Sequence, residues 1–404
     1  MEQHNVILRP VYIDKIRPFI DTELIKVVTG IRRCGKSVML FLIQQELLRR
    51  GINESQLITI NFENMDYAHL LDNENLHREM CRLIQADSSK KYLFFDEIQE
   101  VTDWEKCINS LRVKFDCDIY ITGSNARLLS GELSTYLAGR YVEITVYPLS
   151  FSEFSTLFPD EDIATIFNRY IRVGGMPYLG NLRYEQAAVQ QYLSDLYASI
   201  ILKDIIKRNK VREADLLERI VRYIIANAGN TFSASSITKY LKNEKRTVTV
   251  DTVLNYIQFC ADSFLCYKVR RQNLQGKLIL STQEKYYIAD HGFRQAIFQN
   301  NTADINLVLE NIVYIELLHR GYTIYVGQLK AAEIDFAAQK NDEQCYFQVA
   351  YLLASEETIQ REFGAYDAIA DNYPKYILSL DNYDFSRNGI IHKNIIDWLL
   401  EKQV

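Results

Sequence analysis

One eight-residue stretch restricts the fold of this chain more than any other feature of its sequence. It runs from Gly30 to Ser37 and reads Gly-Ile-Arg-Arg-Cys-Gly-Lys-Ser, between a short apolar run at residues 24–28 and a helix-like apolar run that starts at Val38. Glycine permits the tight backbone path that brings several N–H groups around a phosphate, and the start of a helix adds partial positive charge. The pattern therefore predicts a strand, a phosphate-binding loop and a helix.

The residue types in this loop also predict its ligands, ATP and Mg²⁺. We expect the Lys36 ammonium to reach the β- and γ-phosphates and the Ser37 hydroxyl to ligate Mg²⁺. Cys34 lies inside the loop, so we expect a thiol reagent at this residue to block nucleotide binding. The residues predicted to contact the nucleotide are Gly30, Ile31, Arg32, Arg33, Cys34, Gly35, Lys36, Ser37 and Val38.

Polar side chains follow two later apolar segments that are expected to be buried strands. Asp96 and Glu97 follow the first of these, and Asn125 follows the second. Asp96 is expected to hold the Mg²⁺ shell, and Glu97 to orient or deprotonate the attacking water. Asn125 is expected to hydrogen-bond the γ-phosphate or that water; the alternative is a polar turn that only closes the strand.

Phosphoryl transfer also uses a cation that stabilises charge in the transition state. Arg127 and Arg140 are the candidates, and Arg140 is preferred because it stands directly before a predicted strand. It is expected to act either within its own chain or across a subunit boundary, which would require a homo-oligomer. The alternative is an ordinary surface arginine.

The distribution of charge and cysteine narrows the functional classes. The 404 residues carry a formal charge of −6, and no apolar run is long enough for a membrane span. Seven cysteines without a C-x-x-C pair argue against zinc and disulfide frameworks. We therefore expect a cytoplasmic protein without a membrane partner.

Residues 201–272 differ from the rest, because 14 Lys/Arg and 7 Asp/Glu give this segment a local charge of +7. Within it, three helix-like runs (214–228, 233–241 and 250–262) and two strand-like runs predict a winged helix-turn-helix. The third helix has no cation, so phosphate contacts with DNA are favoured over base readout, and a winged helix that only packs against protein is the alternative. The cations that flank this helix are Lys242, Lys245, Arg246, Lys268, Arg270 and Arg271.

Several blocks along the chain resemble the prokaryotic AAA-superfamily ATPases that carry a C-terminal domain of unknown function. They are Gly30–Ser37, Phe94–Gln99, Thr122–Asn125, Gly139–Arg140, Pro148–Phe151, Gly174–Pro177, Lys285–Asp290 and Leu309–Asn311. The resemblance implies that Lys36 and Ser37 belong to Walker A, Asp96 and Glu97 to Walker B, and Asn125 to sensor 1. It makes Arg140 a candidate arginine finger.

The C-terminal part of this family is similar to restriction-endonuclease-like folds, which bind Mg²⁺ through acids on a helix and a strand. Glu310, Asp335 and Gln348 fall in matching order, but the position of the usual lysine is Ala350. The resemblance therefore implies a retained fold rather than a working nuclease. Ordinary surface polar residues are the alternative interpretation.

The predicted fold class is α/β, in four parts. These are an AAA-like P-loop domain with a parallel sheet (1–150), a helical lid or linker (151–210), the winged helix (211–284) and a restriction-endonuclease-like α/β domain (285–404). The predicted function is Mg²⁺-dependent ATP hydrolysis coupled to conformational change, acting on or near DNA. The alternatives are a nucleotide-operated switch that binds protein partners without DNA, and a metal-dependent DNase.

Overall fold

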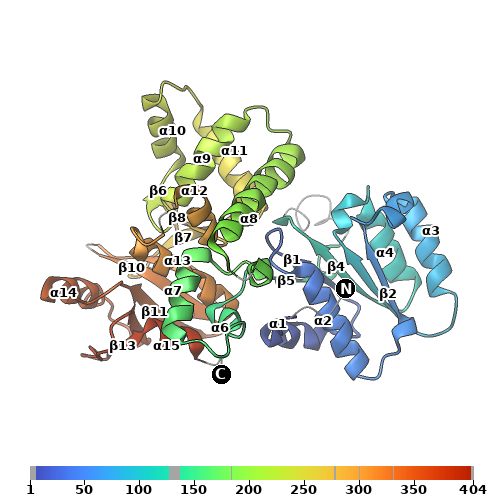
Figure 1. Ribbon diagram of the computed structural model, residues 1–404, viewed down its shortest axis with the longest axis horizontal. Coiled ribbons are helices and arrows are strands. Elements are labelled where there is room, and N and C mark those ends of the chain that lie inside the picture. Colours follow the sequence, from blue (N-terminus) through green and yellow to red (C-terminus); the bar gives the residue numbers. More distant parts are fainter. Residues whose placement is uncertain are drawn as a thin grey trace. The chain divides into compact units, whose positions relative to one another are not determined.

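The computed structural model describes residues 6–126, 137–182, 184–276, 279–299, 301–330 and 332–401. The chain divides into two compact units. Met1–Tyr147 and Asp262–Phe264 form the first unit, and Pro148–Ala261 and Leu265–Val404 form the second (Figure 1). Among the described residues, no helix combines the length and the apolar character needed to cross a membrane.

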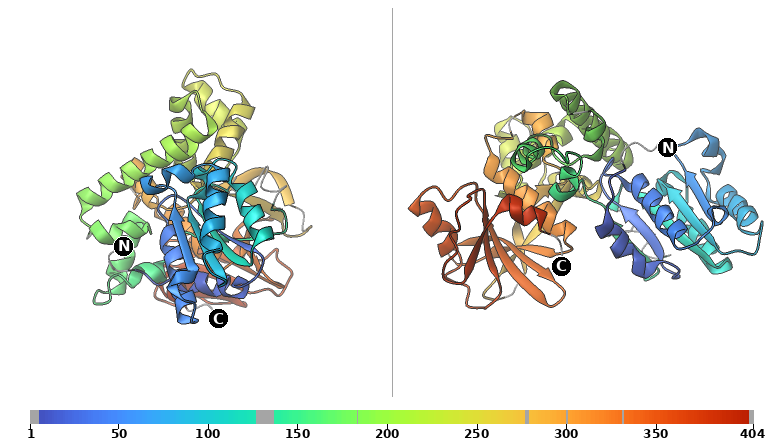
Figure 2. Two further views of the ribbon diagram at one scale, coloured as in Figure 1. Left: turned by 90° about the vertical axis from the view of Figure 1, so that its right-hand side faces the viewer. Right: turned by 60° about the horizontal axis from the view of Figure 1, so that its bottom comes forward.

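The first unit is built on a five-stranded parallel sheet in the order β2-β3-β4-β1-β5. Its helices lie on both faces of the sheet (Figure 2), which explains why the central strands are buried along their whole length. The strands are β1 (Ile25–Thr29), β2 (Leu57–Asn61), β3 (Lys91–Asp96), β4 (Cys117–Gly123) and β5 (Tyr141–Thr145). The α-helices are α1 (Pro10–Ile16), α2 (Lys36–Arg49), α3 (Asn73–Ile84) and α4 (Trp104–Lys114).

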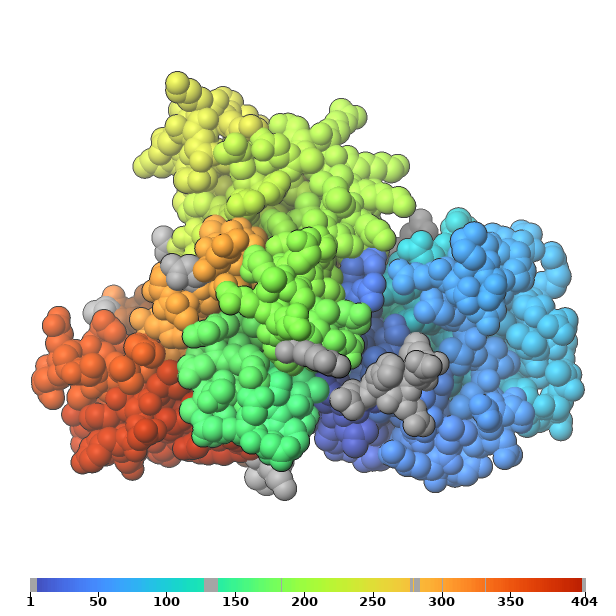
Figure 3. Space-filling view, viewed as in Figure 1, coloured from blue at the N-terminus to red at the C-terminus, as the bar shows by residue number. Residues whose placement is uncertain are grey.

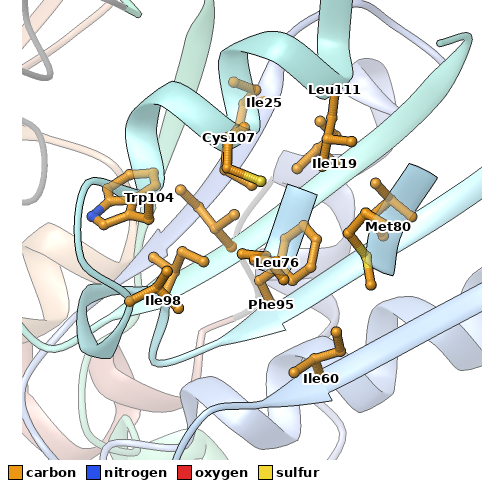
Figure 4. Close-up of a cluster of buried hydrophobic side chains, with 14 of the residues drawn as sticks. Ile25, Ile60, Leu76, Met80, Phe95, Ile98, Trp104, Cys107, Leu111 and Ile119 are labelled. Carbon is orange, nitrogen blue, oxygen red and sulfur yellow. The ribbon is translucent and has the colours of Figure 1, made fainter. Parts of the chain in front are cut away.

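Alternating side chains of the strands form the core on one face of this sheet. There Ile60, Phe95 and Ile119 pack beneath α3 and α4, which contribute Met80 and Cys107 among others (Figure 4). Helix α2 contacts β1, β3 and β4. Because all five strands run parallel, their carboxyl ends meet at one edge, and the loops that follow them share that edge.

The second unit begins with helices. In order they are α6 (Phe151–Ser155), α7 (Ile163–Val173), α8 (Gln186–Ser199), a π-helix (Ile200–Lys207), α9 (Ala214–Ala226), α10 (Ala234–Asn243) and α11 (Val250–Asp262). The three helices predicted for residues 214–262 are therefore present, and Ser233 caps α10 through a hydrogen bond to the N–H of Ser236. In Figure 3 these three helices, coloured yellow-green, form one end of the second unit and the red C-terminal segment forms the other.

An eight-stranded mixed sheet among the described residues completes this unit, in the order β13-β12-β11-β10-β9-β7-β8-β6. Its strands are β6 (Thr231–Phe232), β7 (Cys266–Asn273), β8 (Ile279–Ile288), β9 (Thr323–Gln328), β10 (Glu333–Lys340), β11 (Glu343–Val349), β12 (Lys375–Ser379) and β13 (Ile390–Asn394). The accompanying helices are α12 (Gly292–Phe298), α13 (Ile305–His319), α14 (Glu356–Gly364) and α15 (Ile395–Leu400).

This sheet corrects the predicted domain boundaries. The boundary placed after residue 284 falls inside β8, and β7 pairs in parallel with β9 through Arg271–Asn273. The predicted hairpin strands are therefore continuous with the C-terminal sheet. Apart from Asp262–Phe264, the segments predicted as lid, winged helix and C-terminal domain belong to one compact unit.

Candidate active site

The loop between β1 and α2 has the backbone that its glycines predict. Gly30 has a φ of +140° and Gly35 a φ of +106°, a region that side chains rarely adopt. A Cβ atom on Gly30 would lie 2.2 Å from the carbonyl oxygen of Val146, so no larger residue fits without movement of the backbone. The loop is thus held closely against the end of β5.

Lys36 begins α2 and is buried. Its ammonium lies 3.2 Å from the carbonyl oxygens of both Gly30 and Ile31, and 3.8 Å from Oε1 of Glu97. The cation therefore sits at the mouth of the loop, bound to carbonyl groups that a phosphate can replace. It also brings the loop and the predicted general base into direct electrostatic contact.

Asp96 ends β3 and is surrounded by hydrogen-bond donors from three other segments. Its Oδ1 accepts from the Thr122 hydroxyl at 2.6 Å, and its Oδ2 accepts from the Asn61 amide at 3.0 Å. The Ser37 side chain also hydrogen-bonds this carboxyl group. Burial is the largest influence on the pKa of Asp96 and raises it, against the hydrogen bonds from Thr122 and Ser37, which lower it.

Glu97 has a left-handed backbone with a φ of +55°, which is uncommon for a residue other than glycine. Its N–H donates to the Thr122 hydroxyl at 2.9 Å, and the Gln99 side-chain amide donates to its Oε2. Backbone strain of this kind persists where neighbouring groups fix it, and it is common at functional sites. Thr122 therefore holds the backbone of Glu97 as well as the side chain of Asp96.

Ser124 and Asn125 follow β4 at the same edge of the sheet, and both are buried. Ser124 is only 1% exposed, and its hydroxyl has no hydrogen-bond partner among the residues that the structure describes. Buried polar atoms without a partner are rare, so this hydroxyl is suited to a bound ligand. Sequence reasoning selected Asn125 for this position, and the structure adds Ser124.

The structure disagrees with two other predictions for this region, the reactivity of Cys34 and the action of Arg140 within its own chain. Cys34 is completely buried, and burial raises the pKa of its thiol. The structure therefore argues against the prediction that a thiol reagent at Cys34 blocks nucleotide binding. The carbonyl oxygen of Cys34 instead accepts a hydrogen bond from the buried guanidinium of Arg9 at 3.3 Å. The loop is therefore held by the N-terminal segment as well as by β5.

Arg140 does not lie near these residues within its own chain. It precedes β5, and its carbonyl oxygen accepts from the N–H of Ile25 at the beginning of β1. Five strand residues separate that edge from the loop, or roughly 16 Å. The prediction that Arg140 acts within its own chain is therefore not supported, whereas action across a subunit boundary stays a prediction. Arg127 lies outside the described residues.

The basic segment of the second unit has fewer available cations than its composition indicates. Arg246 pairs with Asp215, Lys268 with Glu284, and Arg271 with Glu333. The outer face of α11 exposes Val250 and Leu254 together with polar residues. Some cations of this segment therefore form ion pairs within the unit, and only the remaining ones are available to an anionic partner.

A parallel sheet with a glycine loop after β1, two acids after β3 and buried polar groups after β4 defines the class of P-loop nucleotide-binding domains. Comparison with known families agrees. Residues 22–155 match the model of the AAA domain family, and residues 164–304 match a domain of unknown function (DUF8612).

Two proteins resemble the chain over most of its length. An uncharacterized protein of Haemophilus influenzae is 36% identical over 98% of this chain and 99% of its own length. An uncharacterized protein of Methanocaldococcus jannaschii is 30% identical over 89% of this chain and 80% of its own length. The chain belongs to the family of AAA-domain proteins that includes these two.

A solved structure shows the same fold at low identity. The Walker-type ATPase of Pyrococcus abyssi aligns with a TM-score of 0.51 and 15% identity, over 71% of this chain and 94% of its own. The α/β class with a parallel central sheet is thus confirmed.

Proposed function

We propose that the first unit binds ATP with Mg²⁺ and hydrolyses it. The observation that carries the proposal is the meeting of Lys36, Asp96 and Glu97 at one edge of the sheet. Ser124 follows β4 at the same edge, and its hydroxyl has no hydrogen-bond partner within the part of the chain that the structure describes. These groups come from three places in the chain, namely the loop after β1, the end of β3 and the end of β4, and each matches a need of phosphoryl transfer.

The residues present fit the nucleotide and the metal ion. Ser37 and Asp96 are hydrogen-bonded to each other, so both would hold Mg²⁺, which commonly takes one or two protein ligands beside phosphates and waters. When bound, the ion neutralises charge on the phosphates. Lys36 would exchange the carbonyls of Gly30 and Ile31 for phosphate oxygens, and Glu97 would accept a proton from the attacking water.

Paired variants test this proposal. Lys36→Ala should abolish both nucleotide binding and hydrolysis, whereas Glu97→Gln should keep binding and stop turnover, because it removes the base and keeps the shape. The measurements are binding of a fluorescent ATP analogue and release of phosphate. Unchanged hydrolysis by Lys36→Ala would show that the proposed mechanism is wrong.

Hydrolysis is proposed to drive a conformational change that acts on or near DNA, through phosphate contacts by cations around α11 such as Lys242, Lys245 and Arg270. A partner protein is the second candidate, and the exposed Val250 and Leu254 on α11 favour it. DNA binding through phosphates would weaken steeply with salt. An ATPase rate that rises with DNA at low salt supports the first candidate, and a rate that ignores DNA supports the second.

Arg140 is proposed to complete the site of a neighbouring subunit in a homo-oligomer. Its position at the far edge of the sheet is consistent with a role outside its own chain. Mixing inactive Glu97→Gln chains with inactive Arg140→Ala chains should restore part of the activity, because some sites then receive both groups. The absence of any restored activity would contradict the proposal.

A further inference from the structure

A buried lysine in the second unit lies at the centre of a cluster of carboxylates. Lys285, on β8, has a side chain that is 6% exposed. Its ammonium lies 3.0 Å from Oε1 of Glu310 on α13, 2.9 Å from Oε1 of Glu333 on β10 and 3.7 Å from Oδ1 of Asp335 on the same strand.

Further hydrogen bonds and an ion pair hold the carboxylates of this cluster. The Tyr287 hydroxyl donates to Oε1 of Glu310 at 2.5 Å, and Arg271 pairs with Oε2 of Glu333 at 3.2 Å. The N–H of Val349 donates to Oδ2 of Asp335 at 2.9 Å. Hydrogen bonds from side chains and backbone thus fix the geometry of all three carboxylates.

Gln348 is the third residue selected from the sequence, and it hydrogen-bonds to a backbone N–H and to another glutamate. Its Oε1 accepts from the N–H of Asp335 at 2.6 Å, and its amide donates to Glu362 at 3.1 Å. The three residues selected from the sequence (Glu310, Asp335 and Gln348) are therefore brought together by the fold. Ala350, at the position of the usual lysine, is buried in an apolar cluster instead.

Two cations offset most of the negative charge of the three carboxylates in this cluster. Glu310, Glu333 and Asp335 carry up to three negative charges, and Lys285 and Arg271 carry two positive charges. Burial is the main cause that raises the pKa of Asp335, and the nearby Glu310 carboxylate raises it further. Among the described residues, no group of three or more His, Cys, Asp or Glu is placed to hold a metal ion.

The metal that a restriction-endonuclease-like fold implies therefore does not fit this site. We propose that the Lys285 ammonium is a built-in counter-ion at the centre of the Glu310–Glu333–Asp335 cluster, so that the wild-type cluster takes no divalent cation. When Lys285 is removed, the three carboxylates can close on the space that its ammonium leaves, and the cluster acquires a site for a divalent cation. Because its partners lie on α13 and β10, the same ammonium ties the β7–β8 hairpin to the C-terminal part of the sheet.

The test uses the full chain without nucleotide, and Mn²⁺ alone as the probe. Bound Mn²⁺ is counted by electron paramagnetic resonance for wild type, Asp335→Asn, Lys285→Ala and the double variant. Wild type and Asp335→Asn should bind the same amount, since any Mn²⁺ at Ser37 and Asp96 is common to both. Lys285→Ala should bind one additional Mn²⁺ per chain, and the double variant should lose it.

Thermal unfolding gives a second measurement. Mn²⁺ should raise the unfolding midpoint of Lys285→Ala by several degrees more than that of wild type, because a ligand that binds only the folded state stabilises it. Lys285→Arg keeps the positive charge and should behave like wild type. A folded Lys285→Ala chain that gains no Mn²⁺ would overturn the proposal.

The comparison of wild type with Asp335→Asn decides the matter even if Lys285→Ala does not fold. Wild-type Mn²⁺ binding that Asp335→Asn abolishes would show that the native cluster is a metal site, and the proposal would be wrong. Equal binding by these two folded chains supports it.

Discussion

Replacement of Thr122 by valine removes a hydroxyl that serves both acids of the candidate active site and leaves the shape of the side chain almost unchanged. The hydroxyl donates to Oδ1 of Asp96 at 2.6 Å and accepts from the N–H of Glu97 at 2.9 Å. A hydrogen bond to a charged group contributes roughly 1.5–3 kcal/mol, and a buried N–H left without a partner costs roughly 1–3 kcal/mol. We take the low end of both ranges, which sum to about 2.5 kcal/mol, because burial raises the pKa of Asp96 and so favours its uncharged form.

If this loss is fully expressed in the transition state, kcat for ATP hydrolysis falls by roughly 70-fold, since each 1.36 kcal/mol corresponds to about tenfold. If half of it already destabilises the resting enzyme, the fall is still about tenfold. The Lys36 contacts to the loop do not involve Thr122, so the affinity for ATP should change little.

The assay is steady-state phosphate release with Thr122→Val beside Thr122→Ser, which keeps the hydroxyl and removes only a methyl group. The serine variant should stay close to wild type. A valine variant that hydrolyses ATP at the wild-type rate would refute the reasoning. Equal losses in both variants would show that packing of the methyl group matters, rather than the two hydrogen bonds.

Two further predictions concern backbone and pH. Gly30→Ala should abolish nucleotide binding, because the new Cβ atom would lie 2.2 Å from the Val146 carbonyl oxygen. Gly51→Ala is the control: Gly51 also has a positive φ, +89°, but a Cβ atom there would meet no atom within 4 Å, so this variant should only lower the unfolding midpoint slightly. Burial lowers the pKa of His291 to about 4. As pH falls from 6.5 toward 4, the unfolded chain therefore protonates this histidine before the folded chain does, and the free energy of unfolding decreases. From pH 7 to pH 5 this loss is about 2 kcal/mol, which His291→Gln should avoid. Urea unfolding of wild type and His291→Gln at pH 7 and pH 5 measures this loss. If the difference in unfolding free energy between the two chains is the same at both pH values, the prediction is wrong.

The sequence predicts the first unit well because its signals are local. The spacing from Gly30 to Ser37 requires a strand, a loop and a helix in direct succession, and the structure has β1, the loop and α2 there. Asp96 and Asn125 follow apolar strands, so a parallel sheet brings them to the same edge. The contacts of Asn61 and Thr122 with Asp96 were missed, although both are polar residues at the ends of strands that flank β3.

Arg140 shows how the same logic can be misapplied. A residue before a parallel strand lies at the edge opposite to residues that follow one, so its place before residues 141–145 already indicated the far edge. By contrast, the pairing of β7 with β9 and the contacts of Lys285 join segments 25 to 55 residues apart. No local pattern encodes such pairing, and the domain boundary at residue 284 was wrong for that reason.

The continuity of β8 with the C-terminal sheet decides where this chain can be divided into fragments. A fragment that stops at residue 284 would cut β8 and remove β9, leaving β7 with backbone N–H and C=O groups that have lost their partners. Such exposed strand edges recruit other chains, so that fragment should aggregate. A fragment that stops at Tyr147 keeps all five strands of its parallel sheet, and it is the natural minimal piece for studying nucleotide binding separately from the second unit.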